Sequence, residues 1–422
     1  MIDRKGLVRV LQDRRVADWV LTEREQELAV VDERAGLQRH ETRTQWTLVV
    51  HDDGPTGRGS ARVTIDALGG RPRDVVEQAL ALAKAAIGPA WQSAPLAAPA
   101  KVALEDPAVA HGDLAALAGA LLAGVRVPPG ATALRHVVVL REQVAAQTHG
   151  GLHATWAATA IRGGALVTAG ARSLEIAREA RRLDDLALGS AVDEAVADLR
   201  ALAGAGVPIA GPCALVLTGD ALLHGGELGV WSVFATQADA VVERQGLTRY
   251  RIGAPVALGA ELVDEPLAIA SDGALDFRIG SAPMGDGGDA VRRFALVEGG
   301  RAAGLALSPR EAAFRHEDPN GGVRNLVVAP GTWAGIGADA ARVVEVRRLR
   351  SLAIDAYTGD ASLEIALGID HVHGEARPFT GGTVRLDLLG ALARARRSKD
   401  VIRRGAYDGP AAVWIEDAEL IS

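Results

Sequence analysis

The stretch GAGVP, residues 204–208, divides the chain into two parts of similar length. It combines two glycines with a proline, the residues that most strongly interrupt helices and strands. A helix is predicted just before it, over residues 190–202, and a strand after it, over residues 214–217. We therefore expect two domains, residues 1–205 and residues 206–422, because 422 residues are many for one hydrophobic core.

The two parts differ in the spacing of their apolar residues. In the first part, apolar residues three or four positions apart alternate with short β-branched runs. This pattern predicts helices over residues 7–21, 71–86 and 113–125, and strands over residues 28–31, 45–50, 63–65, 137–144 and 152–161. Past residue 251, short apolar runs are separated by Gly, Pro and Asp until a last predicted helix over residues 387–397. We therefore predict an α+β fold, with an N-terminal domain of mixed strands and helices and a β-rich C-terminal domain with a barrel-like or curved sheet.

Composition excludes several classes of protein. The formal net charge is −7, and no cluster of basic residues suggests a nucleic-acid partner. Cys213 is the only cysteine, so neither an intrachain disulfide nor a multi-cysteine zinc site can form. Residues 1–19 are charged throughout and lack the apolar core of a signal peptide, and no uncharged apolar stretch approaches a membrane span. We expect a cytoplasmic protein that binds neither nucleic acid nor membrane.

A second informative stretch is LLHGGELG, residues 222–229, at the start of a predicted helix. Zinc peptidases carry H-E-x-x-x-H or a close variant on a helix, where two histidines one turn apart bind Zn²⁺ and the glutamate activates water. Here His224 supplies the first histidine, but Gly225 takes the place of the glutamate, and neither Leu228 nor Gly229 can bind a metal. Catalytic zinc usually has three protein ligands, so His224 is interpreted as the relic of a ligand position or as an ordinary polar histidine.

Three further stretches resemble the TldD/PmbA family, whose second branch is called TldE or PmbA. GSARVTID at 59–66, with the amphipathic run to residue 86, is similar to a family strand of the type G-x-A-x-T-x-D and the helix after it. The segments SDG, GS and MGDGG, within residues 271–288, are similar to D-D-P, G-S and D-D-E-G, although several acids are lost. RNLVVAPG at 324–331 and YTGDAS at 357–362 resemble R-N-x-x-x-x-P-G and x-T-G-D-F-S. These stretches occur in the family's order and span most of the chain.

The resemblance implies a division of labour between two subunits. In the TldD branch, zinc is held by both histidines of the helix motif and a cysteine near the C-terminus. The matching stretch here, KDVIRRGAY at 399–407, contains no cysteine. The resemblance therefore implies a TldE/PmbA-like subunit with no catalytic residue and no cofactor of its own. It would pair with a TldD-like zinc metallopeptidase subunit, which carries the zinc, in a peptide-cleaving heterodimer for peptide maturation or degradation.

Two segments are candidates for contact with a peptide substrate. Arg324 and Asn325 precede an apolar strand, and an extended peptide could add to a sheet edge there. Tyr357, Thr358 and Asp360 lie in a loop that the resemblance places near the active cavity. The alternative for both segments is ordinary turn chemistry, because Asn, Asp and Gly favour turns without any substrate.

Two other readings stay open. The chain could be a partner-independent homodimer that binds peptides without catalysis. It could also be a metalloenzyme, because His371, His373 and Glu375 would lie on one face of a predicted strand and could converge on a metal ion. The alternative for this trio is a polar strand face exposed to water.

Overall fold

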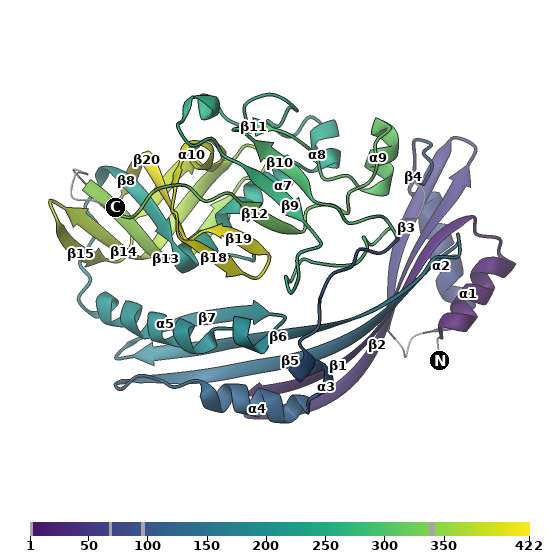
Figure 1. Cartoon of the computed structure of the whole chain (residues 1–422), viewed down its shortest axis with the longest axis horizontal. Helices are drawn as coiled ribbons and strands as arrows, with labels where there is room; N and C mark the ends of the chain where they lie inside the picture. The colour runs from purple at the N-terminus through teal and green to yellow at the C-terminus, as the bar shows by residue number, and fades with distance from the viewer. Residues whose placement is uncertain (1–2, 67–69, 94–97, 337–341) are drawn as a thin grey trace.

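A long, curved antiparallel sheet from the first part of the chain lies against two smaller sheets from the second part (Figure 1). The computed structural model describes residues 3–66, 70–93, 98–336 and 342–422. The strand order of the long sheet is β4-β3-β2-β1-β5-β6-β7. In that order the strands are Ile87–Gly88, Gly57–Asp66, Leu37–Gly54, Asp18–Asp32, Ala131–Thr148, His153–Ala169 and Arg172–Ala180.

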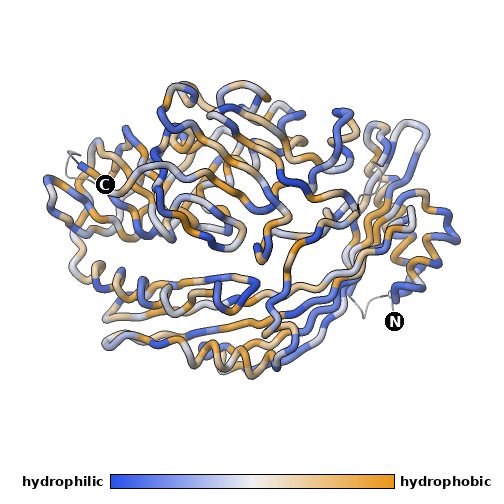
Figure 2. Tube along the Cα trace, viewed as in Figure 1, coloured by the Kyte–Doolittle hydropathy of each residue, from blue (hydrophilic) through white to orange (hydrophobic). Residues whose placement is uncertain are grey.

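Helices cover one face of this sheet. Side chains alternate between the two faces of a strand, so Trp19 and Leu21 of β1 point to one face and Val20 and Thr22 to the other. The first face packs against α1 (Arg4–Asp13) and α2 (Pro72–Ala85) near one end, and against α4 (Leu114–Gly124) and α5 (Leu188–Ala203) near the other. Hydrophobic residues recur along these strands, while the β2–β3 hairpin end is hydrophilic (Figure 2). The second face is turned toward the C-terminal sheets.

Three predicted helices are confirmed, and two of them carry strong local signals at their first turn. α2 has Pro72 at its first turn, α4 is capped by the carboxylate of Asp113, and α5 covers the helix predicted over residues 190–202. The helix predicted over residues 7–21 is too long. α1 ends at Asp13, Arg15 adopts a left-handed conformation with φ of 52°, and Asp18–Leu21 starts β1.

The central strands of the long sheet, β2, β1, β5 and β6, are longer than the apolar runs from which they were predicted. β1 pairs with β2 over its whole length, from Asp18 opposite His51 to Asp32 opposite Leu37. Much of this length is polar, as in the run from Thr22 to Glu27. Apolar runs mark only the part of a strand that lies under a helix, and they therefore underestimate strands whose other parts face water or a cavity.

The second sheet has the order β11-β10-β9-β12-β19-β18. Its strands are, in that order, Arg301–Ala302, Phe294–Glu298, Ile269–Asp272, Asn325–Val328, Tyr407–Pro410 and Val401–Arg404. β12 and β19 are parallel, whereas the other pairs are antiparallel. The short elements around this sheet are α8 (Ala240–Arg244), η3 (Ala260–Leu262) and α9 (Pro309–Arg315). Two others, α3 (Pro107–His111) and η1 (Leu183–Asp185), pack instead with the core of the long sheet.

The third sheet closes into a five-stranded barrel. Its ring runs β13-β8-β20-β16-β14 and returns to β13, with β15 and β17 attached outside the ring. The strands β13, β8, β20, β16, β14, β15 and β17 are Arg342–Ile354, Gly211–Thr218, Ala412–Ile421, Thr383–Asp387, Asp360–Val372, Glu375–Phe379 and Arg396–Arg397. Leu217, Leu363 and Val413 belong to the large core shared by the barrel, α7 (Ser232–Gln237) and α10 (Leu388–Arg394). The predicted α+β class with a barrel-like C-terminal domain is confirmed, while the boundary at residues 205/206 stays a prediction.

The prediction of a helix that begins at residues 222–229 and carries His224 is wrong. The strand β8 leads into α6, which covers only Gly219–Leu222, and turns follow until η2 (Gly229–Trp231). Gly225, Gly226 and Gly229 have φ angles of 80°, 155° and 50°, which a right-handed helix does not allow. The described helices include none that is both long and apolar enough to span a membrane.

Arg181, next to the end of β7, ties the long sheet to the second half of the chain. Its buried guanidinium donates hydrogen bonds to the carbonyls of Arg278 at 2.8 Å, Ile279 at 3.0 Å and Ser281 at 3.1 Å. It also donates to the carbonyl of Thr159 in β6 at 3.2 Å. One side chain therefore satisfies carbonyl groups on both sides of the contact between the sheets.

We expect Arg181→Met to lower the free energy of unfolding by about 2–4 kcal/mol, because buried carbonyls lose a charged donor and such bonds contribute about 1.5–3 kcal/mol each without adding up. Urea unfolding followed by circular dichroism measures this change. Arg182→Met is the matched control: its side chain is 40% exposed and its acidic partners are 3.6–3.9 Å away, so less than about 1 kcal/mol is expected. Equal losses in the two variants would contradict the role given to Arg181.

Candidate functional site

A cavity of about 710 Å³ lies between the edge of the long sheet and the barrel. Seven consecutive residues of β7, from Ser173 to Glu179, form one wall. The opposite walls come from the turn at residues 223–227, from residues 348–350 of β13 and from Arg404 and Gly405 at the end of β18. The cavity therefore collects residues from both predicted domains.

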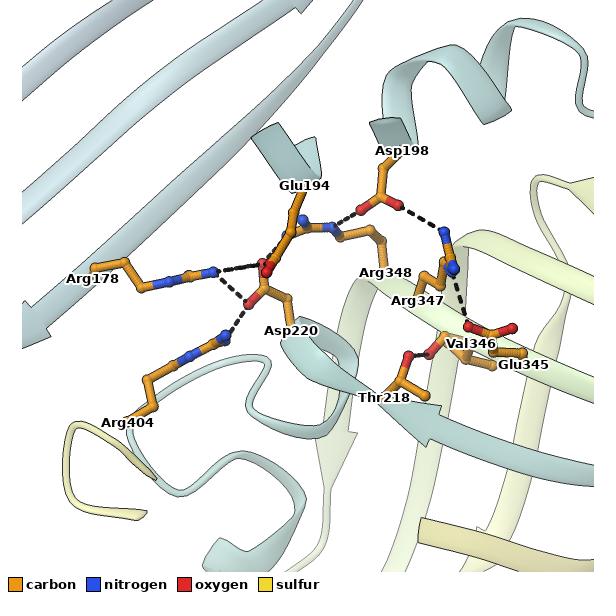
Figure 3. A network of polar contacts seen from close by, with 10 residues as sticks. All are labelled: Arg178, Glu194, Asp198, Thr218, Asp220, Glu345, Val346, Arg347, Arg348 and Arg404. Atoms are coloured by element: carbon orange, nitrogen blue, oxygen red, sulfur yellow. Dashed lines mark hydrogen bonds and ion pairs between the residues drawn. The ribbon is translucent and has the colours of Figure 1, made fainter. Parts of the chain in front are cut away.

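The polar centre of this cavity is Asp220, in the short helix α6. Three guanidinium groups converge on its carboxylate (Figure 3). Arg178 of β7 lies 3.1 Å away, and Arg348 of β13 and Arg404 of β18 are in direct contact with it. Each arginine comes from a different sheet, so this one carboxylate links all three.

The network continues away from the cavity. Arg348 also pairs with Asp198 of α5 at 2.7 Å, and Asp198 lies 3.6 Å from Arg347. Arg347 pairs in turn with Glu345 at 2.9 Å (Figure 3). The register of β13 shifts around Arg347, and this bulge allows neighbouring arginines to serve the same network. One connected network of ion pairs thus links the helix α5, the long sheet and the barrel.

The protonation of Asp220 follows from this environment. Burial alone would raise the pKa of the Asp220 carboxyl, but Arg348, Arg178 and Arg404 together hold this pKa below its ordinary value. Burial lowers the pKa of the Arg178 guanidinium, and the neighbouring charges of Arg404 and Arg348 lower it further against the opposing effect of Asp220. The Asp220 carboxylate is therefore ionised at neutral pH. The three guanidinium groups around it are all positively charged and repel one another.

His224 lies on the wall of the same cavity, in the turn after α6. Burial lowers the pKa of its imidazole, and Asp220 opposes this effect. Glu227, three residues later, borders both this cavity and a second one of about 390 Å³. Burial and the neighbouring Glu179 raise the pKa of the Glu227 carboxyl. His224 has no helical neighbour one turn on, because the glycine turns redirect the chain.

The three residues His371, His373 and Glu375 do not converge. β14 ends at Val372, and His373 and Gly374 form the hairpin turn with φ angles of 48° and 82°. His371 is bonded to Glu345 at 3.0 Å, whereas Glu375 pairs with Arg377. The expectation of one shared strand face is wrong because the strand ends between the two histidines. In the described residues, no group of three or more His, Cys, Asp or Glu side chains is arranged to hold a metal ion.

Arg324 and Asn325 have different surroundings although they are neighbours. Arg324 lines the 390 Å³ cavity and donates to the carbonyl of Gly321 at 3.0 Å. Asn325 is fully buried, accepts from the amide of Gly280 at 2.9 Å and donates to Asp272 and Ser281. The prediction that Asn325 contacts a peptide does not fit this structure, because its buried side-chain amide is bonded to Gly280, Asp272 and Ser281. Arg324 stays a candidate for peptide contact.

The segment with Tyr357, Thr358 and Asp360 forms the turn between β13 and β14, at the end of β14 opposite to His371. It borders none of the cavities found in the described residues. Asp355 accepts hydrogen bonds from the amides of Tyr357 and Thr358 at 3.0 and 3.2 Å, and Thr358 donates to Asp360 at 3.0 Å. These contacts account for the motif as a turn. Its predicted role in substrate binding has no support in this arrangement.

No direct signal in the sequence marks the arginine cluster. Arg178, Asp220, Arg348 and Arg404 are dispersed over the chain, and each looks like an ordinary surface charge in its own segment. The nearest hint is the presence of two consecutive arginines in predicted strand segments, at 347–348 and 403–404. Successive side chains of a strand point to opposite faces, so one arginine of each pair should face inward unless a bulge intervenes.

We expect Asp220→Asn to lower the free energy of unfolding by about 3–5 kcal/mol, because removing one partner of a buried ion network leaves uncompensated charge. Urea unfolding at pH 7 measures the loss. Glu194→Gln is the control, since this carboxylate is 59% exposed and 3.7 Å from Arg178, and a change of about 0.5 kcal/mol or less is expected. A loss below about 1 kcal/mol in Asp220→Asn would show that the network does not hold the sheets together.

A comparison of the wild type with Asp220→Asn also gives a prediction for the pH dependence of stability. Because the folded pKa of Asp220 is lowered, its contribution is present above the unfolded pKa of about 3.9 and is lost as pH falls through the folded pKa. The difference in unfolding free energy between the wild type and Asp220→Asn should stay constant from about pH 7 to pH 5 and shrink below about pH 4. Urea unfolding of both proteins across this range tests it; a difference that shrinks between pH 7 and pH 5 would mean a raised pKa instead.

Residues 230–422 match the family model described as PmbA/TldA metallopeptidase C-terminal domain. No curated protein sequence matches the chain. Among solved structures, TldE from Thermococcus kodakarensis is similar at a TM-score of 0.78 and 15% identity, covering 99% of both chains. A candidate modulator of DNA gyrase from Bacteroides thetaiotaomicron has a TM-score of 0.79 and 14% identity, covering 100% of this chain and 99% of its own.

A second candidate modulator of DNA gyrase, from Thermotoga maritima, has a TM-score of 0.78 and 15% identity over 99% of both chains. At these identities the solved structures establish a shared fold over the whole chain, and the family model adds the C-terminal sequence. The resemblance to the TldD/PmbA family is confirmed: the sequence of residues 230–422 matches the family's C-terminal domain, and the whole chain shares the fold of TldE.

Proposed function

We propose that this chain is a TldE-like subunit that holds no catalytic zinc and pairs in the cytoplasm with a TldD-like zinc metallopeptidase subunit. The heterodimer would cleave peptides for their maturation or degradation. The observation that carries this proposal is the position of Arg404. By the family resemblance, the segments of His224 and of residues 399–407 correspond to those that supply zinc ligands in the TldD branch.

In this chain those two segments meet at one cavity. A side chain at Gly405 would come within 3.6 Å of the Glu227 side chain, and His224 and Arg404 line the same walls. A guanidinium rather than a thiolate therefore lines the cavity that His224 also lines. Together with Arg178 and Arg348, it makes the cavity unfavourable for a divalent cation, because three positive charges surround the carboxylate of Asp220.

Association with a partner is supported by exposed apolar side chains in one segment. Leu247, Ile252 and Leu258, between α8 and η3, are 50%, 55% and 94% exposed. Large apolar residues clustered on a surface commonly mark protein interfaces. We assign this segment to the contact with the zinc subunit.

Peptidase assays on this chain, on its zinc-bearing partner and on the co-expressed pair test the proposal. We expect cleavage of an unstructured peptide by the pair and none by this chain alone. Substituting alanine for the first histidine of the partner's motif should abolish the activity of the pair, because that residue is a zinc ligand. Cleavage by this chain alone would contradict the proposal. A stable homodimer that binds peptides and adds no activity to the partner would support the non-catalytic peptide-binding alternative.

A further inference from the structure

A second group of ionisable side chains lies on the face of the long sheet that is turned toward the C-terminal sheets. The strand register places Asp18 of β1 opposite His51 of β2, and His51 opposite Ser60 of β3. Residues directly opposite one another in an antiparallel sheet point to the same face, so these three polar side chains form one row across the sheet. Trp19, the neighbour of Asp18, points to the helices on the other face.

The carboxylate of Asp18 is the centre of this group. Its side chain is 10% exposed and contacts the guanidinium of Arg58, whose own side chain is 7% exposed. Nδ1 of His149, just past the end of β5, lies 2.9 Å from the same carboxylate. The imidazole of His51 is half-buried, and its Nδ1 lies 2.8 Å from Oγ of Ser60. One buried carboxylate thus has an arginine and a histidine as direct partners, and a second histidine is next to it in the row.

Residues 91–93, which follow β4, cover this group. Trp91 is 8% exposed, and the guanidinium of Arg58 lies 4.5 Å from the centroid of its ring. The His51 ring makes a T-shaped contact with the same indole, with 4.9 Å between the centroids and 82° between the planes. Arg58 also donates to the carbonyl of Trp91 at 3.2 Å, and Oγ of Ser93 contacts the carboxylate of Asp18. The segment is therefore held on the sheet by Arg58, His51 and Asp18.

Two buried polar groups lack a partner while the segment lies in this position. Nε1 of Trp91 and Nε of Arg58 have no hydrogen-bond acceptor within the described residues, although Asp53 lies 3.4 Å from the Arg58 nitrogen. A buried N–H group without an acceptor makes the docked position less favourable, because water would satisfy it. Docking therefore depends on the contacts that the Trp91 ring makes with Arg58 and His51.

A proton on His51 acts against this docking. The charged and titratable groups that face His51 are Asp18, Arg58, Asp53 and His149. Burial is the main cause that lowers the pKa of the His51 imidazole, and Arg58 and His149 lower it further against the opposing effect of the two aspartates. The docked structure therefore favours the neutral imidazole. Docking is strongest above the ordinary histidine pKa of 6.5 and weakens as pH falls below it, because a protonated His51 is better solvated by water.

We propose that residues 91–93 form a latch that is closed while His51 is neutral and opens when His51 takes up a proton. The same connection between β4 and α3 is bonded further along to the second half of the chain. There the amide of Ala100 donates to the carbonyl of Pro283 at 2.7 Å, and the amide of Ala103 to the Asp276 carboxylate at 2.8 Å. Opening the latch therefore frees one end of a connection whose other end stays bonded. Its operation does not require the proposed peptide processing.

The test is fluorine NMR of the full chain labelled with 5-fluorotryptophan, from about pH 8 to about pH 5 at constant ionic strength. The chain has seven tryptophans, and the resonance of Trp91 is the one that is missing in Trp91→Phe. The shift of a resonance between H₂O and D₂O reports whether its ring contacts solvent. We expect a Trp91 resonance shielded from solvent at the high end of this range and exposed at the low end, with a midpoint below pH 6.5.

Histidine variants assign the transition to one side chain. His51→Asn cannot take up the proton and should keep Trp91 shielded down to about pH 5; His51→Gln serves the same purpose if that variant does not fold. His149→Asn should keep the transition, because His149 contacts Asp18 rather than Trp91. His40→Asn is the matched control on the same strand, since its side chain is 55% exposed and bonded to Glu27 at 2.9 Å. It should leave the transition unchanged.

Three results would overturn the latch. The first is a Trp91 resonance that stays shielded throughout the pH range in the wild type. The second is a transition that persists without His51 or disappears without His149, because another group would then be the sensor. The third is a joint change of all seven resonances at one midpoint, which would mean unfolding of the whole chain rather than release of one segment. None of these results depends on peptidase activity, so the latch and the proposed function fail independently.

Discussion

The contact of Asp220 with three arginines is the interaction on which the arrangement of this molecule depends. β7, β13 and β18 belong to three different sheets, and Asp220 contacts one arginine from each. Buried ion networks rarely stabilise a protein more than well-packed apolar residues would, but losing one member of such a network is costly. Here the network fixes where the sheets meet, and it does so at the wall of a cavity. The same charges therefore join the sheets and form part of the cavity wall.

The same network bears on the proposal that this chain holds no catalytic zinc. After α6, Gly225 and Gly226 turn the chain away from the helix that would carry a second ligand. At the end of β18, Arg404 occupies the segment in which the family resemblance places a cysteine. Both changes act on the same cavity, since His224 and Arg404 line it. These two local features support the proposed division of roles between a zinc-bearing partner and this chain.

The parts of the fold that the sequence predicted are those with local causes. α2, α4 and α5 carry an apolar stripe, and α2 and α4 also have a proline or a capping aspartate at the start. The strand lengths were missed because the polar parts of β1 and β2 gain their partners from distant residues. The helix predicted to carry His224 does not form, because Gly225, Gly226 and Gly229 adopt positive φ angles. The arginine cluster was beyond reach, since it joins four segments and depends on a bulge in β13.

The most direct test of the central proposal, that this chain holds no catalytic zinc, is a calorimetric titration of Zn²⁺ into the purified chain at pH 7. The account predicts no stoichiometric binding below a dissociation constant of about 10 μM, because one histidine beside three guanidinium groups gives too few ligands for zinc. Binding of one zinc per chain at nanomolar concentration that is lost in His224→Ala would contradict it. Such a result would mean that the cavity is a metal site and that the chain itself is a candidate catalyst.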